Sequence, residues 1–101
     1  MRVNILNIAR DGKEGNYCGR GSPLGNYAFK EGMTRNEACD AFEIYFKEKV
    51  QKGDVVVMQE LHRLRTILEE TGSVDIRCFC YPKRCHLQTI ADWLIDNAFE
   101  E

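Results

Sequence analysis

Residues 73–80 alternate strictly between the two faces of an extended chain, and helical patterns precede and follow them. Small apolar residues share one face, and charged or bulky residues share the other: Val74, Ile76, Cys78 and Cys80 against Asp75, Arg77 and Phe79. A strand that alternates with helices is typical of α/β folds, in which helices cover a sheet. This segment therefore restricts the chain to a layered architecture built around a small sheet.

Two further segments predict consecutive helices. Thr34 and Glu37 form a capping box, and an apolar stripe follows them as far as Gly53, where we expect the first helix to end. Asp54 can cap a second helix, which we expect to end at Gly72. The run of valines that opens this second segment leaves a strand as the alternative.

A last helix and two short strands complete the prediction. The helix runs from Arg84 to about Ala98, residues 3–8 have the pattern of a buried strand, and Tyr17-Cys18 that of a very short one. The resulting order is strand, loop, helix, helix, strand, helix. We therefore predict a single α/β domain over residues 1–101, with a sheet of few strands, about three helices and a Rossmann-like character.

Composition and charge exclude several classes of protein. Hydrophobic residues make up 44% of the chain and charged residues 30%, which is typical of a globular domain, and the net charge of −2 disfavours nucleic-acid binding. The longest fully apolar run, residues 55–58, is far shorter than the ~20 residues of a membrane span, so we expect no membrane partner. The five cysteines are an odd number and no signal-peptide pattern precedes them, so we expect a cytoplasmic protein without a disulfide framework.

Three cysteines and a histidine are clustered between Cys78 and His86, and three interpretations of this cluster stay open. In the first, Cys78 is a small buried hydrophobe, because it shares a strand face with apolar residues. In the second, Cys78, Cys80, Cys85 and His86 hold zinc. The spacing differs from the usual paired cysteines, and adjacent Cys85 and His86 could both ligate only at a sharp backbone bend. We therefore predict no metal and no cofactor.

The third interpretation is an anion pocket, because Cys85 and His86 follow the end of a strand and open a helix. Ligands of α/β folds bind beyond the carboxyl ends of strands, and the first amides of a helix attract anions. Cys80, Lys83 and Arg84 would belong to the same pocket. A cysteine at a helix start has a lowered pKa, so Cys85 as nucleophile and His86 as acid or base are the candidate catalytic residues.

A glycine-rich loop follows the second short strand and offers a second set of ligand-binding residues. It departs from the two phosphate-loop patterns, G-x4-G-K-[ST] and G-x-G-x-x-G, but it holds an arginine between two glycines and a turn at residues 22–25. A guanidinium is a good bidentate partner for phosphate or carboxylate. The predicted ligand-binding residues of this loop are Gly19, Arg20, Gly21, Ser22 and Asn26.

Residues 17–26 and 78–86 together resemble the two signatures of an uncharacterised family, domain of unknown function 4326. The first matches a Tyr-x-Gly-Arg-x-Ser-Pro-Leu-Gly-Asn string, and the second a Cys-x-Cys-x-Pro-x-x-Cys-His string. Tyr27 stands where many members have proline, and Leu87-Gln88 replaces a Gly-Asp or Ala-Asp pair. The resemblance implies a compact α/β domain whose two motif loops meet. It is also consistent with a phage or mobile-element origin, and so with a host cytoplasm.

Three functions are compatible with these motifs. In the first, the two loops form one pocket for a nucleotide or a related phosphorylated or anionic small molecule, which the protein senses or sequesters. In the second, Cys85 and His86 serve a hydrolase or transferase that acts on a nucleotide-like substrate. In the third, zinc staples a protein-interaction module. The sequence does not decide whether the protein is an enzyme, and it leaves the oligomeric state open.

Overall fold

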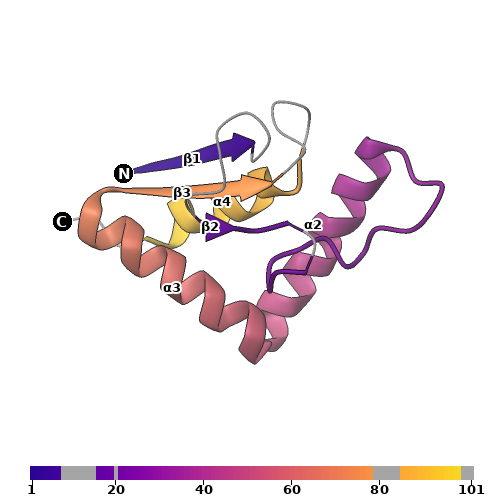
Figure 1. Ribbon diagram of the computed structural model, residues 1–101. Helices are drawn as coiled ribbons and strands as arrows, with labels where there is room; N and C mark the ends of the chain where they lie inside the picture. Colours follow the sequence, from indigo (N-terminus) through magenta and orange to yellow (C-terminus); the bar gives the residue numbers. More distant parts are fainter. Residues whose placement is uncertain (8–15, 20, 79–84, 99–101) are drawn as a thin grey trace.

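The computed structural model describes residues 1–7, 16–19, 21–78 and 85–98. They form a small α/β fold, as predicted, with three helices and a three-stranded parallel sheet in the described part of the chain (Figure 1). The strand order is β1-β3-β2, where β1 is Arg2–Asn7, β2 is Asn16–Tyr17 and β3 is Ser73–Cys78. The last strand in the sequence is therefore the central strand of the sheet.

The two consecutive helices have the limits that their capping residues predict. Helix α2 is Arg35–Lys52, with both bonds of the Thr34/Glu37 capping box present and Gly53 in the left-handed conformation after it. Helix α3 is Val55–Thr71, and its first turn is capped by the Asp54 carboxylate, which accepts a hydrogen bond from the Val57 amide at 3.1 Å. The strand alternative for the valine run is therefore wrong.

The last strand and the last helix differ from the prediction at their limits. Of the predicted strand 73–80, residues 73–78 form β3, and residues 79 and 80 lie outside the described residues. Helix α4 is Leu87–Asn97, so Cys85 and His86 precede its first turn, with His86 at the N-cap position. The predicted start at Arg84 is too early, because Cys85 is not helical and His86 lies in a turn.

The core lies between the sheet and the helices α3 and α4, both of which contact β3. Its fully buried members come from all three elements and include Leu61, Leu64, Ile76, Ile90 and Leu94. Arg77 is also buried, with only 7% of its surface exposed, although the alternation assigned it to the face opposite the core. Arg77 lies beside the chain that continues from β2, since Tyr17 is its register partner and the Cys18 amide donates to its carbonyl at 2.9 Å.

Beyond the sheet, the chain after β2 runs alongside α2, which extends away from the strands (Figure 1). The Asn26 side-chain amide donates a hydrogen bond to the Ala38 carbonyl of α2 at 3.0 Å, and this bond attaches the glycine-rich loop to the helix. No helix among the described residues is long and apolar enough to cross a membrane.

Candidate functional site

A cleft of about 930 Å³ opens beyond the carboxyl ends of two neighbouring strands. Tyr17, the last residue of β2, and Cys78, the last residue of β3, both line it. Cys85 and His86 line it from the turn before α4, and three glycines of the loop after β2 complete this side: Gly19, Gly21 and Gly25. The two motif segments therefore meet at one cleft.

Two successive turns shape the glycine-rich loop. The Ser22 amide donates to the Gly19 carbonyl at 3.1 Å, and the Gly25 amide donates to the Ser22 carbonyl at 3.1 Å, which is the bond that the predicted turn at residues 22–25 requires. Gly21 has a φ of 87°, a conformation that glycine adopts without strain. A Cβ atom on Gly25 would lie 2.6 Å from the Gly19 carbonyl oxygen, so the loop closes tightly upon itself there.

Ser22 supports this loop rather than the cleft. Its hydroxyl also donates to the Gly19 carbonyl, at 2.7 Å, and only 8% of the residue is exposed. Both of its hydrogen-bond donors are therefore engaged inside the loop, and neither faces an anion in this conformation. Ser22 therefore stabilises the turn of the loop, and we do not count it among the ligand contacts.

His86 joins the two motif segments directly. Its Nε2 atom lies 2.7 Å from the Cys18 carbonyl oxygen, which immediately precedes the glycine-rich loop. Because a carbonyl oxygen only accepts hydrogen bonds, Nε2 carries the proton and donates it. The ring also packs edge-on against Phe42 of α2, with centroids 4.9 Å apart. His86 therefore holds the loop, the turn before α4 and α2 together.

Two thiols and one ring nitrogen lie next to this contact. The sulfur atoms of Cys78 and Cys85 are 2.9 Å apart, and the Cys85 sulfur is 3.6 Å from Nδ1 of His86. Both cysteines are buried, as the packing interpretation of Cys78 expects, but both also line the cleft. Within the described residues, no group of three or more ligating side chains is arranged to hold a metal ion.

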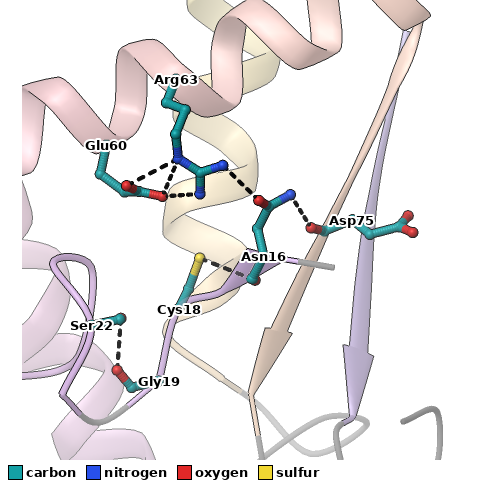
Figure 2. Close-up of polar contacts among 7 residues, drawn as sticks. All are labelled: Asn16, Cys18, Gly19, Ser22, Glu60, Arg63 and Asp75. Atoms are coloured by element: carbon teal, nitrogen blue, oxygen red, sulfur yellow. Dashed lines mark hydrogen bonds and ion pairs between the residues drawn. The ribbon is translucent and has the colours of Figure 1, made fainter. Parts of the chain in front are cut away.

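A chain of polar contacts fixes the strand that leads into the loop (Figure 2). The Arg63 guanidinium of α3 pairs with Glu60 and donates to the Asn16 side-chain oxygen at 2.9 Å. The Asn16 amide nitrogen in turn donates to the Asp75 carbonyl of β3 at 3.0 Å. The start of the glycine-rich segment is thus anchored to both a helix and the central strand.

Cys18 lies at the end of this anchored segment. It is fully buried, and its thiol is an unusually weak acid. Burial and the negative charge of Glu60 raise the pKa of its thiol from 9.0 to about 12. Between pH 9 and about pH 12, the Cys18 thiol therefore keeps its proton in the folded chain and loses it in the unfolded chain. Stability from this thiol is therefore complete below pH 9 and is lost as the pH rises towards 12.

We therefore expect the free energy of unfolding of the wild-type protein to fall with rising pH relative to a Cys18→Ala variant. Urea unfolding of both proteins at about pH 8 and about pH 10.5 measures this difference, and other alkaline titrations cancel between them. A difference between the two proteins that does not change with pH would show that Cys18 is not desolvated as described.

Four of the predicted ligand-binding residues, Arg20, Cys80, Lys83 and Arg84, lie outside the described residues. The zinc site considered above includes Cys80, so it also lies partly outside the described residues. The described candidates that reach the cleft are Gly19, Gly21, Asn26, Cys85 and His86. Five of the predicted residues therefore line one cleft.

Other residues of the cleft wall were not identified from the sequence. They include Tyr27 and Phe29 from the segment after the loop, together with Arg35 and Cys39 from the first turns of α2. Tyr27 and Phe29 could have been found from the sequence, because they are aromatic residues in an otherwise polar segment. The placement of α2 depends on the contact of Asn26 with the Ala38 carbonyl, and no periodicity in the sequence reveals such a contact.

Comparison with known proteins adds a family and a phage relative. The family model described as Domain of unknown function (DUF4326) matches residues 5–96. An uncharacterised 12.4 kDa protein of Enterobacteria phage T4, from the nrdA-td intergenic region, is 27% identical over 82 residues, which are 81% of this chain and 68% of the phage protein. No solved structure matches the chain.

Proposed function

Because this chain belongs to the DUF4326 family, whose description names no activity, we propose its function from the cleft: it binds a nucleotide or a related phosphorylated small molecule. The observation that carries the proposal is the meeting of the glycine-rich loop with the Cys85–His86 turn at one cleft. The similarity to a phage protein supports a role in a phage or mobile element, where such a protein would sense or sequester its ligand.

The size and place of the cleft support a small-molecule ligand. Its volume of about 930 Å³ is near the upper end of the ~300–1,000 Å³ typical of ligand pockets. It lies beyond the carboxyl ends of parallel strands, where α/β folds bind their ligands. Tyr17 at the end of β2 and Cys78 at the end of β3 mark this edge.

The aromatic residues of the cleft favour a ligand with a planar ring. Tyr17, Tyr27 and Phe29 are exposed by 37%, 59% and 49% although they are large and apolar, and all three line the cleft. The Tyr27 hydroxyl donates to the Ser22 carbonyl at 2.7 Å, so its ring is held in place before a ligand arrives. Aromatic rings of this kind stack on nucleobases, and Arg35 supplies a positive charge for phosphate in the same cleft.

Thermal unfolding in the presence of nucleosides, nucleotides and inorganic phosphate tests the proposal. A phosphorylated nucleoside should raise the melting temperature, with a stabilisation of about 2.7 kcal/mol at a concentration 100 times its Kd. The unphosphorylated nucleoside and phosphate alone should each stabilise less, because each engages only part of the cleft. If no phosphorylated nucleoside shifts the transition, the proposed function is wrong.

Replacing Arg20 by lysine tests the anion contact predicted for the glycine-rich loop; this residue lies outside the described residues. Lysine keeps the charge but lacks the planar guanidinium, so we expect nucleotide binding at least about tenfold weaker, or 1.4 kcal/mol. Folding should change by no more than about 0.5 kcal/mol. Calorimetric titration measures binding, and Arg2→Lys, at an exposed residue of β1, is the matched control. Unfolding of Arg20→Ala would instead identify a structural arginine.

A nucleotide-directed hydrolase or transferase is the second candidate, and one observation favours it. Nδ1 of His86 lies 3.6 Å from the Cys85 sulfur, while Nε2 is oriented by the Cys18 carbonyl. A nucleophile, a base and a group that orients the base are the elements of thiol catalysis. Release of product from a nucleotide that stabilises the fold, lost in Cys85→Ser, would support the enzyme; stabilisation without turnover supports the binding protein.

A further inference from the structure

The thiols of Cys78 and Cys85 are close enough to react with each other. Their sulfur atoms are 2.9 Å apart, and small side-chain rotations bring such a pair to the disulfide bond length of about 2.05 Å. Only 1% of Cys78 and 3% of Cys85 are exposed, but both residues line the cleft, which is the side from which a small oxidant would approach them. The pair joins the end of β3 to the turn before α4.

The neighbouring histidine favours Cys85 as the thiol that reacts first. Its Nδ1 atom lies 3.6 Å from the Cys85 sulfur. In the neutral ring this nitrogen has a free lone pair, because the ring proton is on Nε2, where it is donated to the Cys18 carbonyl. Nδ1 can therefore accept the thiol proton of Cys85, and the thiolate is the nucleophilic form of cysteine.

We propose that Cys78 and Cys85 are an oxidisable dithiol that a small peroxide converts to a disulfide. The Cys85 thiolate attacks one peroxide oxygen, the O–O bond breaks, and the departing hydroxide takes up a proton and leaves as water. The resulting sulfenic acid is attacked by the Cys78 thiol, which forms the S–S bond and releases a second water. Two electrons pass from the sulfur atoms to the peroxide, so one hydrogen peroxide consumes two thiols and yields two waters.

The bond would change the cleft as well as the fold. It would attach the carboxyl end of the central strand covalently to the residue before His86, in the wall where the two motif segments meet. Because the cross-link restricts the unfolded chain, we expect the oxidised protein to melt about 5 °C or more above the reduced protein. The inference stands independently of the ligand proposed above.

Mass spectrometry of the full chain after treatment with hydrogen peroxide tests the proposal. The oxidised chain should lose two hydrogen atoms, and trypsin should release residues 78–83 linked to residues 85–101. Cys80 shares the first peptide with Cys78, so the experiment is repeated in a Cys80→Ser protein, where the link should persist. Dithiothreitol should reverse both the mass change and the shift in melting temperature.

Three further variants complete the test. Cys78→Ser and Cys85→Ser should each abolish the link, whereas Cys39→Ser, at another buried cysteine of the same cleft, should retain it. Circular dichroism verifies folding, and Cys78→Ala and Cys85→Ala replace any serine variant that does not fold. Loss of the link in Cys80→Ser overturns the proposal. Zinc bound near one equivalent by the reduced protein, with both thiols protected from peroxide, also overturns it in favour of a metal site.

Discussion

The variant His86→Ala should lose about 3 kcal/mol of unfolding free energy and most of the nucleotide binding proposed above. The substitution removes the hydrogen bond to the Cys18 carbonyl and leaves that oxygen without its imidazole donor, which costs about 1–3 kcal/mol. It also removes a buried ring that packs edge-on against Phe42, and the space left behind adds to the loss. Because His86 joins the glycine-rich loop to the turn before α4, two segments that line the cleft lose their common support.

Urea unfolding and calorimetric titration measure the two effects. The matched control is His62→Ala, since His62 is exposed on α3, pairs with Arg65 and does not line the cleft. This control should change stability by less than about 0.5 kcal/mol. If His86→Ala were as stable as the control, the contact between Nε2 and the Cys18 carbonyl would not support the fold.

Gly25→Ala should destabilise the protein by about 3 kcal/mol, although the change adds only one methyl group. The new Cβ would lie 2.6 Å from the Gly19 carbonyl oxygen, a backbone atom that cannot move alone. The same oxygen accepts bonds from the amide and the hydroxyl of Ser22, so relief of the clash disturbs both turns of the loop. We also expect the loop to lose its share of ligand binding.

Gly21→Ala separates this steric effect from the effect of backbone conformation. Gly21 has a φ of 87°, but a Cβ there meets nothing within 4 Å, so only the strain of the left-handed conformation remains. That strain costs about 1 kcal/mol. Equal losses for the two variants in urea unfolding would show that the close approach to the Gly19 carbonyl does not determine the effect at Gly25.

The sequence predicts local structure in this chain well because its helix ends carry explicit chemical signals. The ends of a helix leave backbone amides and carbonyls without hydrogen-bond partners inside the helix. In α2 and α3 these groups are bonded at capping residues, so the limits of both helices follow from Thr34 with Glu37, Gly53, Asp54 and Gly72. The turn before α4 lacks such a signal, since the N-cap residue His86 makes no side-chain capping bond. Its side chain is bonded to Cys18 instead, and the predicted helix start was too early for this reason.

The cleft is predictable only in part because half of its wall depends on contacts between distant segments. Residues at or soon after the end of a strand, such as Cys78 and Cys85, follow from the general position of ligand sites in α/β folds. Arg35 and Cys39 line the cleft because the side chain of Asn26 attaches the loop to α2. No pattern in the sequence predicts that hydrogen bond. The burial of Arg77 does not follow from alternation, because alternation describes one strand and not the chain segments that lie beside it.

The place of β3 between β1 and β2 also determines when the fold can be completed during synthesis. Both outer strands are made early, and in the described sheet each is hydrogen-bonded to β3, which leaves the ribosome much later. Asn4 and Asp75, which bond across the sheet, are 71 positions apart in the chain. Such high contact order slows folding, and the unpaired strands of the nascent chain stay exposed to aggregation until β3 emerges. Helices α2 and α3 form from local contacts in the meantime, so we expect a helical intermediate to precede the sheet.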